Sequence, residues 1–208
     1  MRLAGAVIIA AAIAVVTASV VYATEYELKW DTGNTSSTVI ITNVGEGTWF
    51  ANDFDVSTLG RRYVDRIKIM SSGYRYAPWD GFRIAIFDFD QVPGKIIWPT
   101  SGVPKFVKGS GSHEFDWCEF DVGWTLPPGN DAFVVGQEQF YLPPACDPYC
   151  FDDNVEHRWH TWRKATPTRD WNLHYSQARD KNVMIRVILT GDVGIQPASL
   201  GRVKALYH

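Results

Sequence analysis

Hydrophobic and polar residues alternate in short runs along most of this chain. Phe82, Ile84 and Ile86 alternate with Arg83 and Ala85, a pattern that predicts a strand half buried on one face. Gly, Pro, Asn and Asp separate the runs, and the 3.6-residue periodicity of helices is almost absent after residue 23. We therefore expect about ten strands, namely Tyr26–Trp30, Thr38–Thr42, Thr48–Val56, Val64–Ser71, Phe82–Phe89, Lys95–Trp98, His113–Val122, Ala132–Phe140, Arg158–Lys164 and Val183–Thr190.

This density of strands and turns favours an all-β fold, a single antiparallel β-sandwich with a jelly-roll-like arrangement, over residues 24–191. Residues 192–208 are expected to form a C-terminal tail, which is either an added edge strand or a disordered end. Trp, Tyr and Phe make up 14% of the 208 residues. Large rings of this kind fill the layer between two facing sheets.

The first 23 residues have the composition of a secretory signal peptide. Arg2 precedes an apolar run from Leu3 to Val21, and a small-residue site ends at Ala23. We expect cleavage after Ala23, and an uncleaved membrane anchor is the alternative, since the run is long enough to span a bilayer. Either way the domain is expected outside the cytoplasm, whether secreted, on the cell surface or in the periplasm, where disulfides can form.

The balance of charges argues against one class of partner. Lys and Arg total 20 and Asp and Glu total 23, which gives a net charge of −3. Without a basic field, the chain is not expected to bind nucleic acid.

An acidic cluster is the sharpest candidate for chemistry. Glu114, Asp116 and Glu119 lie close together in one predicted strand. Glu114 and Asp116 would share a face, and a bulge would bring Glu119 onto it, where three carboxylates could shift one another's pKa values as a retaining glycosidase needs. Without a bulge, Glu119 falls on the opposite face, and the carboxylates are ordinary solvent-facing groups of an amphipathic strand.

The six residues 114–119 resemble the catalytic strand of the jelly-roll laminarinase and agarase glycoside hydrolases. This resemblance implies a nucleophile at Glu114, a helper at Asp116 and the acid/base at Glu119. It covers only the hexad, and we expect no catalysis, with the glycosidase kept as an alternative.

Two cysteines and two histidines form a second cluster. In an exported protein, Cys146 and Cys150 are expected to form a loop disulfide. A zinc site that adds His157 and His160 is the alternative, although the spacing fits poorly. Cys118 is expected to be a buried small hydrophobe.

Acidic loops offer hard oxygen ligands. Asp88 and Asp90, or Asp152, Asp153 and Asn154, could bind Ca²⁺. Solvated turn residues are the preferred interpretation, so we expect no metal or other cofactor, with Ca²⁺ as the alternative.

Several tryptophans lie outside the best-alternating strands. Trp159, Trp162 and Trp171 are the candidate ligand-binding residues, because exposed rings beside polar groups can stack on sugars. The alternative is that these rings pack the rim of the sandwich.

The chain from Tyr26 to Gly191 resembles a β-sandwich module of large secreted or surface proteins of bacteria, often found beside type IX sorting domains. The matching features are LKWDTG, FRIAIFDFD followed by QVPGK, LPPGNDAFVVGQEQ, the cysteine loop and NVMIRVILTG. The resemblance implies a non-catalytic adhesion, binding or spacer unit. Its expected partner is a polysaccharide or another cell-surface component, and self-association as a surface or filament subunit is a further alternative.

Overall fold

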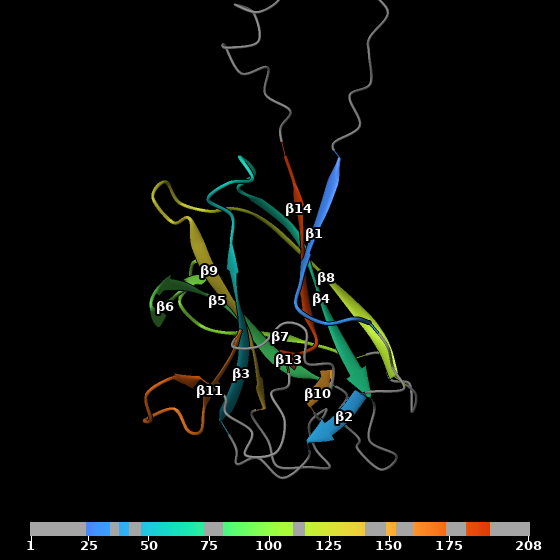
Figure 1. The fold of residues 1–208 in the computed structure, drawn as a ribbon. Helices are drawn as coiled ribbons and strands as arrows, with labels where there is room; N and C mark the ends of the chain where they lie inside the picture. Colours follow the sequence, from blue (N-terminus) through green and yellow to red (C-terminus); the bar gives the residue numbers. More distant parts are fainter. Residues whose placement is uncertain are drawn as a thin grey trace, which may run out of the picture.

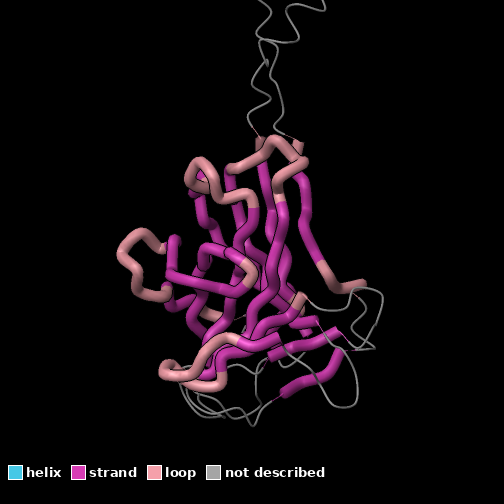
Figure 2. Tube along the Cα trace, turned by 60° about the vertical axis from the view of Figure 1, so that its left-hand side comes forward, coloured by secondary structure: helices cyan, strands magenta, loops and turns pink. Residues whose placement is uncertain are grey.

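A computed structural model describes residues 24–33, 38–41, 47–72, 81–109, 115–139, 149–152, 160–173 and 182–191. The predicted leader, 1–23, and the predicted tail, 192–208, lie outside these residues. Within the described part of the chain there are fourteen strands and no helix (Figure 2). No helix in that part is therefore long and apolar enough to cross a membrane.

All strand pairs are antiparallel, which confirms the predicted all-β sandwich. The strands form a four-stranded sheet, a three-stranded sheet and a seven-stranded sheet (Figure 1). The four-stranded sheet has the order β1 (Glu25–Lys29), β14 (Ile185–Thr190), β4 (Tyr63–Ser72) and β8 (Phe115–Thr125). The three-stranded sheet has the order β13 (Asn182–Val183), β10 (Tyr149–Asp152) and β2 (Thr38–Ile41).

The seven-stranded sheet contains the longest series of neighbouring strands. Its order is β12 (Asn172–Leu173), β11 (Thr161–Lys164), β3 (Thr48–Asp55), β9 (Ala132–Gln139), β5 (Phe82–Asp90) and β6 (Val92–Trp98), and β7 (Lys105–Val107) also pairs with β5. The fourteen observed strands exceed the expected ten or so, because β7, β10 and β12 were not expected and one expected strand is divided. Alternation cannot reveal strands as short as β7 or β12, and the predicted strand Val183–Thr190 is divided into β13 and β14.

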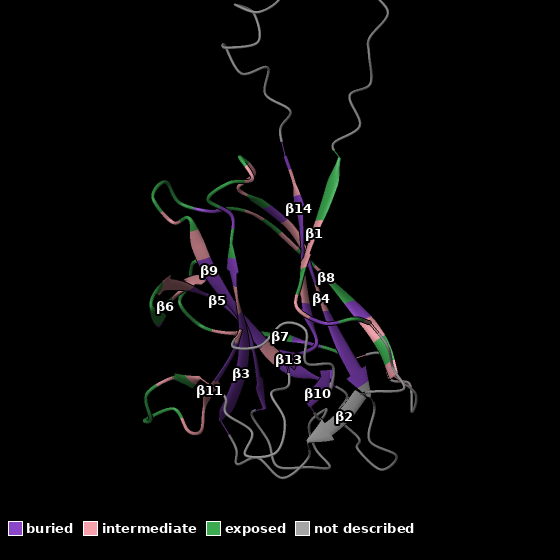
Figure 3. Ribbon diagram, in the orientation of Figure 1, coloured by how far each residue is buried: buried purple, intermediate pink, exposed green. Residues whose placement is uncertain are grey.

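The main core lies between the two larger sheets. Phe50, Phe54, Ile67, Phe82 and Val187 are all at most 1% exposed and belong to one hydrophobic cluster. Most residues of β3 and β14 are buried, while the upper part of β1 is exposed (Figure 3). Alternating side chains on facing strands thus build the sandwich core that the sequence pattern predicts.

The seven-stranded sheet is also buried on its outer face. Ala85 and Phe87 alternate with the core residues of β5, yet both are buried, so β5 is not the half-buried strand that its pattern predicts. They belong to a second cluster with Trp49, Val134 and Trp162. A sequence pattern cannot show that other parts of the chain cover this face.

Candidate functional site

One line of side chains crosses the outer face of the seven-stranded sheet. Register pairs Phe106 with Arg83, Arg83 with Glu138, Glu138 with Trp49 and Trp49 with Lys164. Directly opposed residues in neighbouring antiparallel strands share a face, so these five side chains form a cross-strand row from β7 to β11. Four steps of about 4.8 Å give the row a length of about 19 Å.

The two ends of the cross-strand row are accessible, and its middle is not. Phe106 is 47% exposed, and Arg83 and Lys164 are half-buried. Glu138 and Trp49 are only 6% and 5% exposed. The row therefore offers an aromatic ring and two cations around a buried carboxylate.

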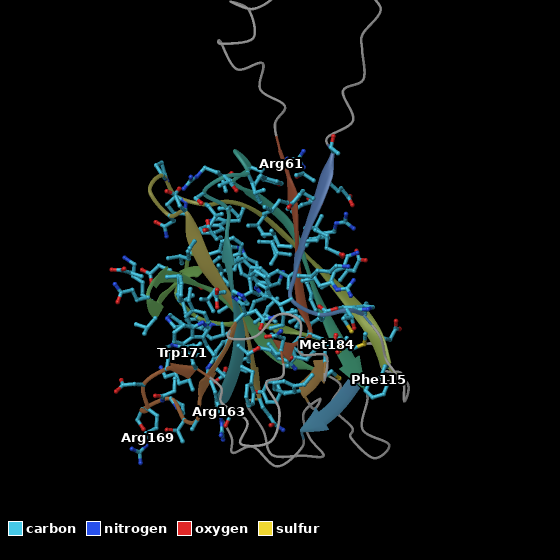
Figure 4. All side chains as sticks on the ribbon, viewed as in Figure 1. Arg61, Phe115, Arg163, Arg169, Trp171 and Met184 are labelled. Atoms are coloured by element: carbon cyan, nitrogen blue, oxygen red, sulfur yellow. The ribbon has the colours of Figure 1, made fainter. Side chains whose placement is uncertain are left out.

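Trp171 extends the cross-strand row beyond Lys164. The Lys164 Nζ atom lies 6.0 Å from the centre of the Trp171 ring. That ring packs against Trp49 and Phe87, with centroid distances of 6.4 Å and 5.1 Å. It is half-buried, so part of it faces solvent beside β11 (Figure 4).

Small residues under these rings explain why they lie close to the sheet. Ala85, Gly136 and Ala51 are directly opposed across β5, β9 and β3, next to the cross-strand row. A Cβ atom on Gly136 would lie 2.9 Å from Trp49 Cε3 and 3.0 Å from Phe87 Cε2. The small side chains thus form a trough that the Trp49 and Phe87 rings fill.

Glu138 is the electrostatically unusual group of the row. Burial raises the pKa of Glu138, and the opposing effects come from Arg83, from a hydrogen bond with the Trp49 side chain and from the charge of Lys164. The Arg83 Nη1 atom lies 3.4 Å from Glu138 Oε2. The carboxylate is thereby held between a cation and an indole rather than in water.

The candidate ligand-binding tryptophans that the structure describes differ in their exposure to solvent. Trp162 is 7% exposed, and its indole N–H donates to Asp53 Oδ1 at 2.9 Å. Its ring also contacts the Phe89 ring, so it packs against the sheet and is not the exposed platform we expected. Trp171 keeps an accessible part, and Trp159 lies outside the described residues.

Two members of the acidic cluster, Asp116 and Glu119, do not share a face of their strand. Register runs without interruption from Asp116, opposite Ser71, to Glu119, opposite Lys68. No bulge separates them, so Asp116 and Glu119 lie on opposite faces of β8. Glu114 lies outside the described residues.

Glu119 belongs to a network of ion pairs on the outer face of the four-stranded sheet. Its carboxylate lies 3.1 Å from Lys68 Nζ and 2.8 Å from Arg66 Nη1. The hydrogen bond from Lys68, with the charges of Lys68 and Arg66, lowers the pKa of Glu119. A lowered pKa favours the ionised form of Glu119, whereas the acid/base role that the hexad resemblance implies needs a carboxyl that can be protonated.

The cysteine and histidine cluster is only partly described. Cys150 is buried in β10, and no disulfide joins two cysteines of the described residues. Cys146 and His157 lie outside those residues, so the predicted Cys146–Cys150 disulfide stays a prediction. His160 stacks on Trp30 at 3.5 Å, and its Nδ1 lies 3.0 Å from Asp53 Oδ2, which gives this histidine a packing role.

The candidate Ca²⁺ ligands are used within the fold or lie in solvent. The Asp88 Oδ1 atom accepts a hydrogen bond from the Lys95 N–H in the β5–β6 hairpin, and Asp90 is exposed. Asp152 is buried and accepts a hydrogen bond from Thr32 Oγ1, whereas 153 and 154 lie outside the described residues. No group of three potential metal-binding side chains occurs among the residues that the structure describes.

Sequence reasoning missed most of the cross-strand row. Phe106, Arg83, Glu138 and Lys164 come from four strands that are far apart in the chain. Only the strand register brings them together, and a single sequence contains no direct signal for that register. The alternation within each strand could place each residue on a face, but not beside its neighbours.

The comparisons with known proteins show a similar fold and no family. The chain matches no protein-family model, and no curated protein sequence gives a significant match. A solved structure of the Clostridial cysteine protease Cwp84 after propeptide cleavage has a TM-score of 0.54 and 13% identity, and the match covers 81% of this chain and 40% of that one.

A second solved structure contains the cysteine protease and lectin-like domains of Cwp84, a surface layer associated protein of Clostridium difficile. Its TM-score is 0.50 at 13% identity, and the match covers 76% of this chain and 36% of that one. The chain therefore spans well under half of the Cwp84 chains it matches. At this level of identity the similarity shows a fold alone, a β-rich sandwich like part of a surface layer associated protein.

Proposed function

We propose that this chain is a non-catalytic carbohydrate-binding module of the bacterial cell surface, with its sugar site on the cross-strand row. The observation that carries the proposal is the order of side chains along that row. Phe106 and Trp171 provide ring surface at its two ends, and Arg83 and Lys164 provide hydrogen-bond donors between them. An apolar ring beside a few fixed polar groups is the usual composition of a small-molecule site.

The rigidity of the row supports this proposal. All five of its members belong to strands, and the Trp49 and Phe87 rings pack against the Trp171 ring that extends the row. Side chains that are already ordered lose little conformational entropy when a ligand binds. The lectin-like domain in one similar structure and its surface-layer association support a sugar ligand and a cell-surface location.

Binding to neutral polysaccharides tests this function. We expect the purified protein to be retarded on an immobilised neutral β-glucan or galactan, and Phe106→Ala and Trp171→Ala to weaken that retention. Loss of one stacked ring costs about 0.5–1.5 kcal/mol, or roughly a twofold to thirteenfold loss of affinity. Tyr26→Ala is the matched control, because Tyr26 is also exposed but belongs to the four-stranded sheet.

Trp171→Ala and Phe106→Ala are expected to differ in their effect on the stability of the fold. Trp171→Ala removes a ring that covers the second cluster, so its folding is checked by thermal unfolding. Phe106→Ala removes an exposed ring and is expected to fold normally. Retention that is equal in the wild type, Phe106→Ala and Tyr26→Ala would contradict the proposed site, and no retention on any of these polymers would contradict the function.

A further inference from the structure

A pocket of about 450 Å³ lies at one end of the four-stranded sheet, where β4 begins and β8 and β14 end. Three of its lining residues are opposed across neighbouring strands, since Tyr63 pairs with Thr190 on one side and with Thr125 on the other. Glu25 is opposite Thr190 at the end of this line, and its carboxylate is paired with Arg66. Arg61 and Arg62, in the segment that enters β4, complete its lining. The lining residues include two arginines and no carboxylate.

The Arg61 guanidinium makes few hydrogen bonds within the described part of the chain. Among the described residues its guanidinium donates one hydrogen bond, to the Thr24 carbonyl oxygen, and forms no ion pair. It also lies over the Tyr26 ring, 5.8 Å from the centre, and its side chain packs against Gly191. A guanidinium has five N–H donors, so most of those of Arg61 have no partner within the described part of the chain.

Arg62 contributes mainly as a support. Its Nη1 pairs with Asp131 at 2.8 Å, and its Nη2 donates to the carbonyl oxygens of Pro127 and Asn130. These bonds fix the guanidinium at the pocket wall and offset part of its charge. Its Nε is buried and has no hydrogen-bond partner among the described residues, which is a costly state for an N–H group.

We propose that this pocket binds an oxyanion carried on a hydroxylated unit, either the carboxylate of an acidic sugar or a phosphate of a surface polymer. The Arg61 guanidinium would pair with the anion, and the hydroxyl groups of Tyr63, Thr125 and Thr190 would bind the neighbouring hydroxyls. Charge-assisted hydrogen bonds from arginine suit both carboxylate and phosphate oxygens. The pocket lies on the four-stranded sheet, so this inference does not depend on the sugar site proposed for the seven-stranded sheet.

Calorimetric titration with D-glucuronate, inorganic phosphate and D-glucose tests the pocket. We expect an anion to bind and neutral glucose not to bind comparably, and the preferred anion identifies the carboxylate or the phosphate source. Arg61→Gln should weaken that binding about tenfold or more, as expected for loss of a charge-assisted hydrogen bond. Added salt should weaken it too, because an anion paired with a partly exposed arginine is screened.

Arg169→Gln is the matched control, because Arg169 is exposed and lies at the opposite end of the molecule from Arg61 (Figure 4). It should bind the anion as tightly as the wild type. In an NMR titration with the preferred anion, the backbone amide chemical shifts should change most at Gly60, Thr125, Thr190 and Gly191. The inference is overturned if neither anion binds more tightly than glucose, or if Arg61→Gln and Arg169→Gln behave alike. Loss of retention on neutral polysaccharide in the Phe106 variant leaves this result unaffected, so the two proposals fail separately.

Discussion

The trough under the aromatic rings makes a quantitative prediction about Gly136. Replacing it with alanine places a Cβ atom 2.9 Å from Trp49 Cε3, 3.0 Å from Phe87 Cε2 and 3.3 Å from Ala51 Cβ. The two rings cannot move away freely, because they contact each other at 5.1 Å and Trp171 lies against both. We therefore expect Gly136→Ala to destabilise the fold.

Two opposing effects determine the size of that loss. Alanine lowers the conformational entropy of the unfolded chain, which stabilises the fold by roughly 0.4–1 kcal/mol where the backbone permits it. Overpacking a filled site costs about 1–3 kcal/mol. The midpoints of these two ranges give a net loss in the free energy of unfolding of about 1.3 kcal/mol, which lowers the melting temperature by roughly 3–5 °C for a chain of this size.

Urea unfolding followed by tryptophan fluorescence measures this loss. The atom nearest the new Cβ is Trp49 Cε3, and Trp49→Phe removes it. The loss of stability caused by Gly136→Ala should therefore be smaller in the Trp49→Phe background than in the wild type. This double-mutant cycle separates the ring contact from any general effect on the strand. A Gly136→Ala protein as stable as the wild type, or more stable, would refute the tight trough.

Three further predictions concern charge and assembly. Glu138→Gln should become more stable relative to the wild type as pH rises. The reason is that folding raises the pKa of Glu138 above its ordinary value of 4.5, so the folded state binds this proton more tightly than the unfolded state does. The stabilisation from the protonated carboxyl is present below that value and is lost as pH rises through the raised pKa, so equal urea midpoints at all pH values would contradict it. Arg186→Ala should cost about 3–5 kcal/mol, because it leaves the fully buried Asp31 carboxylate without its partner, and a loss below 1 kcal/mol in urea unfolding would contradict that pairing. Self-association through the outer edge of β1, which pairs only with β14 among the described strands, stays a prediction, and a constant monomeric mass in light scattering at rising concentration would contradict it.

The sequence predicted the strands well because period-two alternation is a local property. The observed strand Thr48–Asp55 differs by one residue from its prediction, and Phe82–Asp90 and Ala132–Gln139 also lie within one residue of theirs. The fold class followed directly, since many short strands between turns leave few alternatives. Even the two faces of β8 were predictable, apart from whether a bulge separates Asp116 from Glu119.

The site could not be predicted in the same way because it depends on register and on coverage. Register decides that Arg83 and Glu138 are opposed, although 55 residues separate them in the chain. Coverage decides that Trp162 is buried while Trp171 keeps an accessible part. Both properties arise from distant parts of the chain, so tryptophan content alone could indicate ring packing or a binding surface equally well.

The most direct test is to map where a sugar binds on the folded protein. Backbone amide and tryptophan side-chain resonances would be followed by NMR while an oligosaccharide of the retained polysaccharide is added. Binding on the cross-strand row predicts that the largest shifts occur at Phe106, Arg83, Lys164 and Trp171, with little change across β1 and β14. Shifts confined to the four-stranded sheet, or no shifts at saturating sugar, would contradict it.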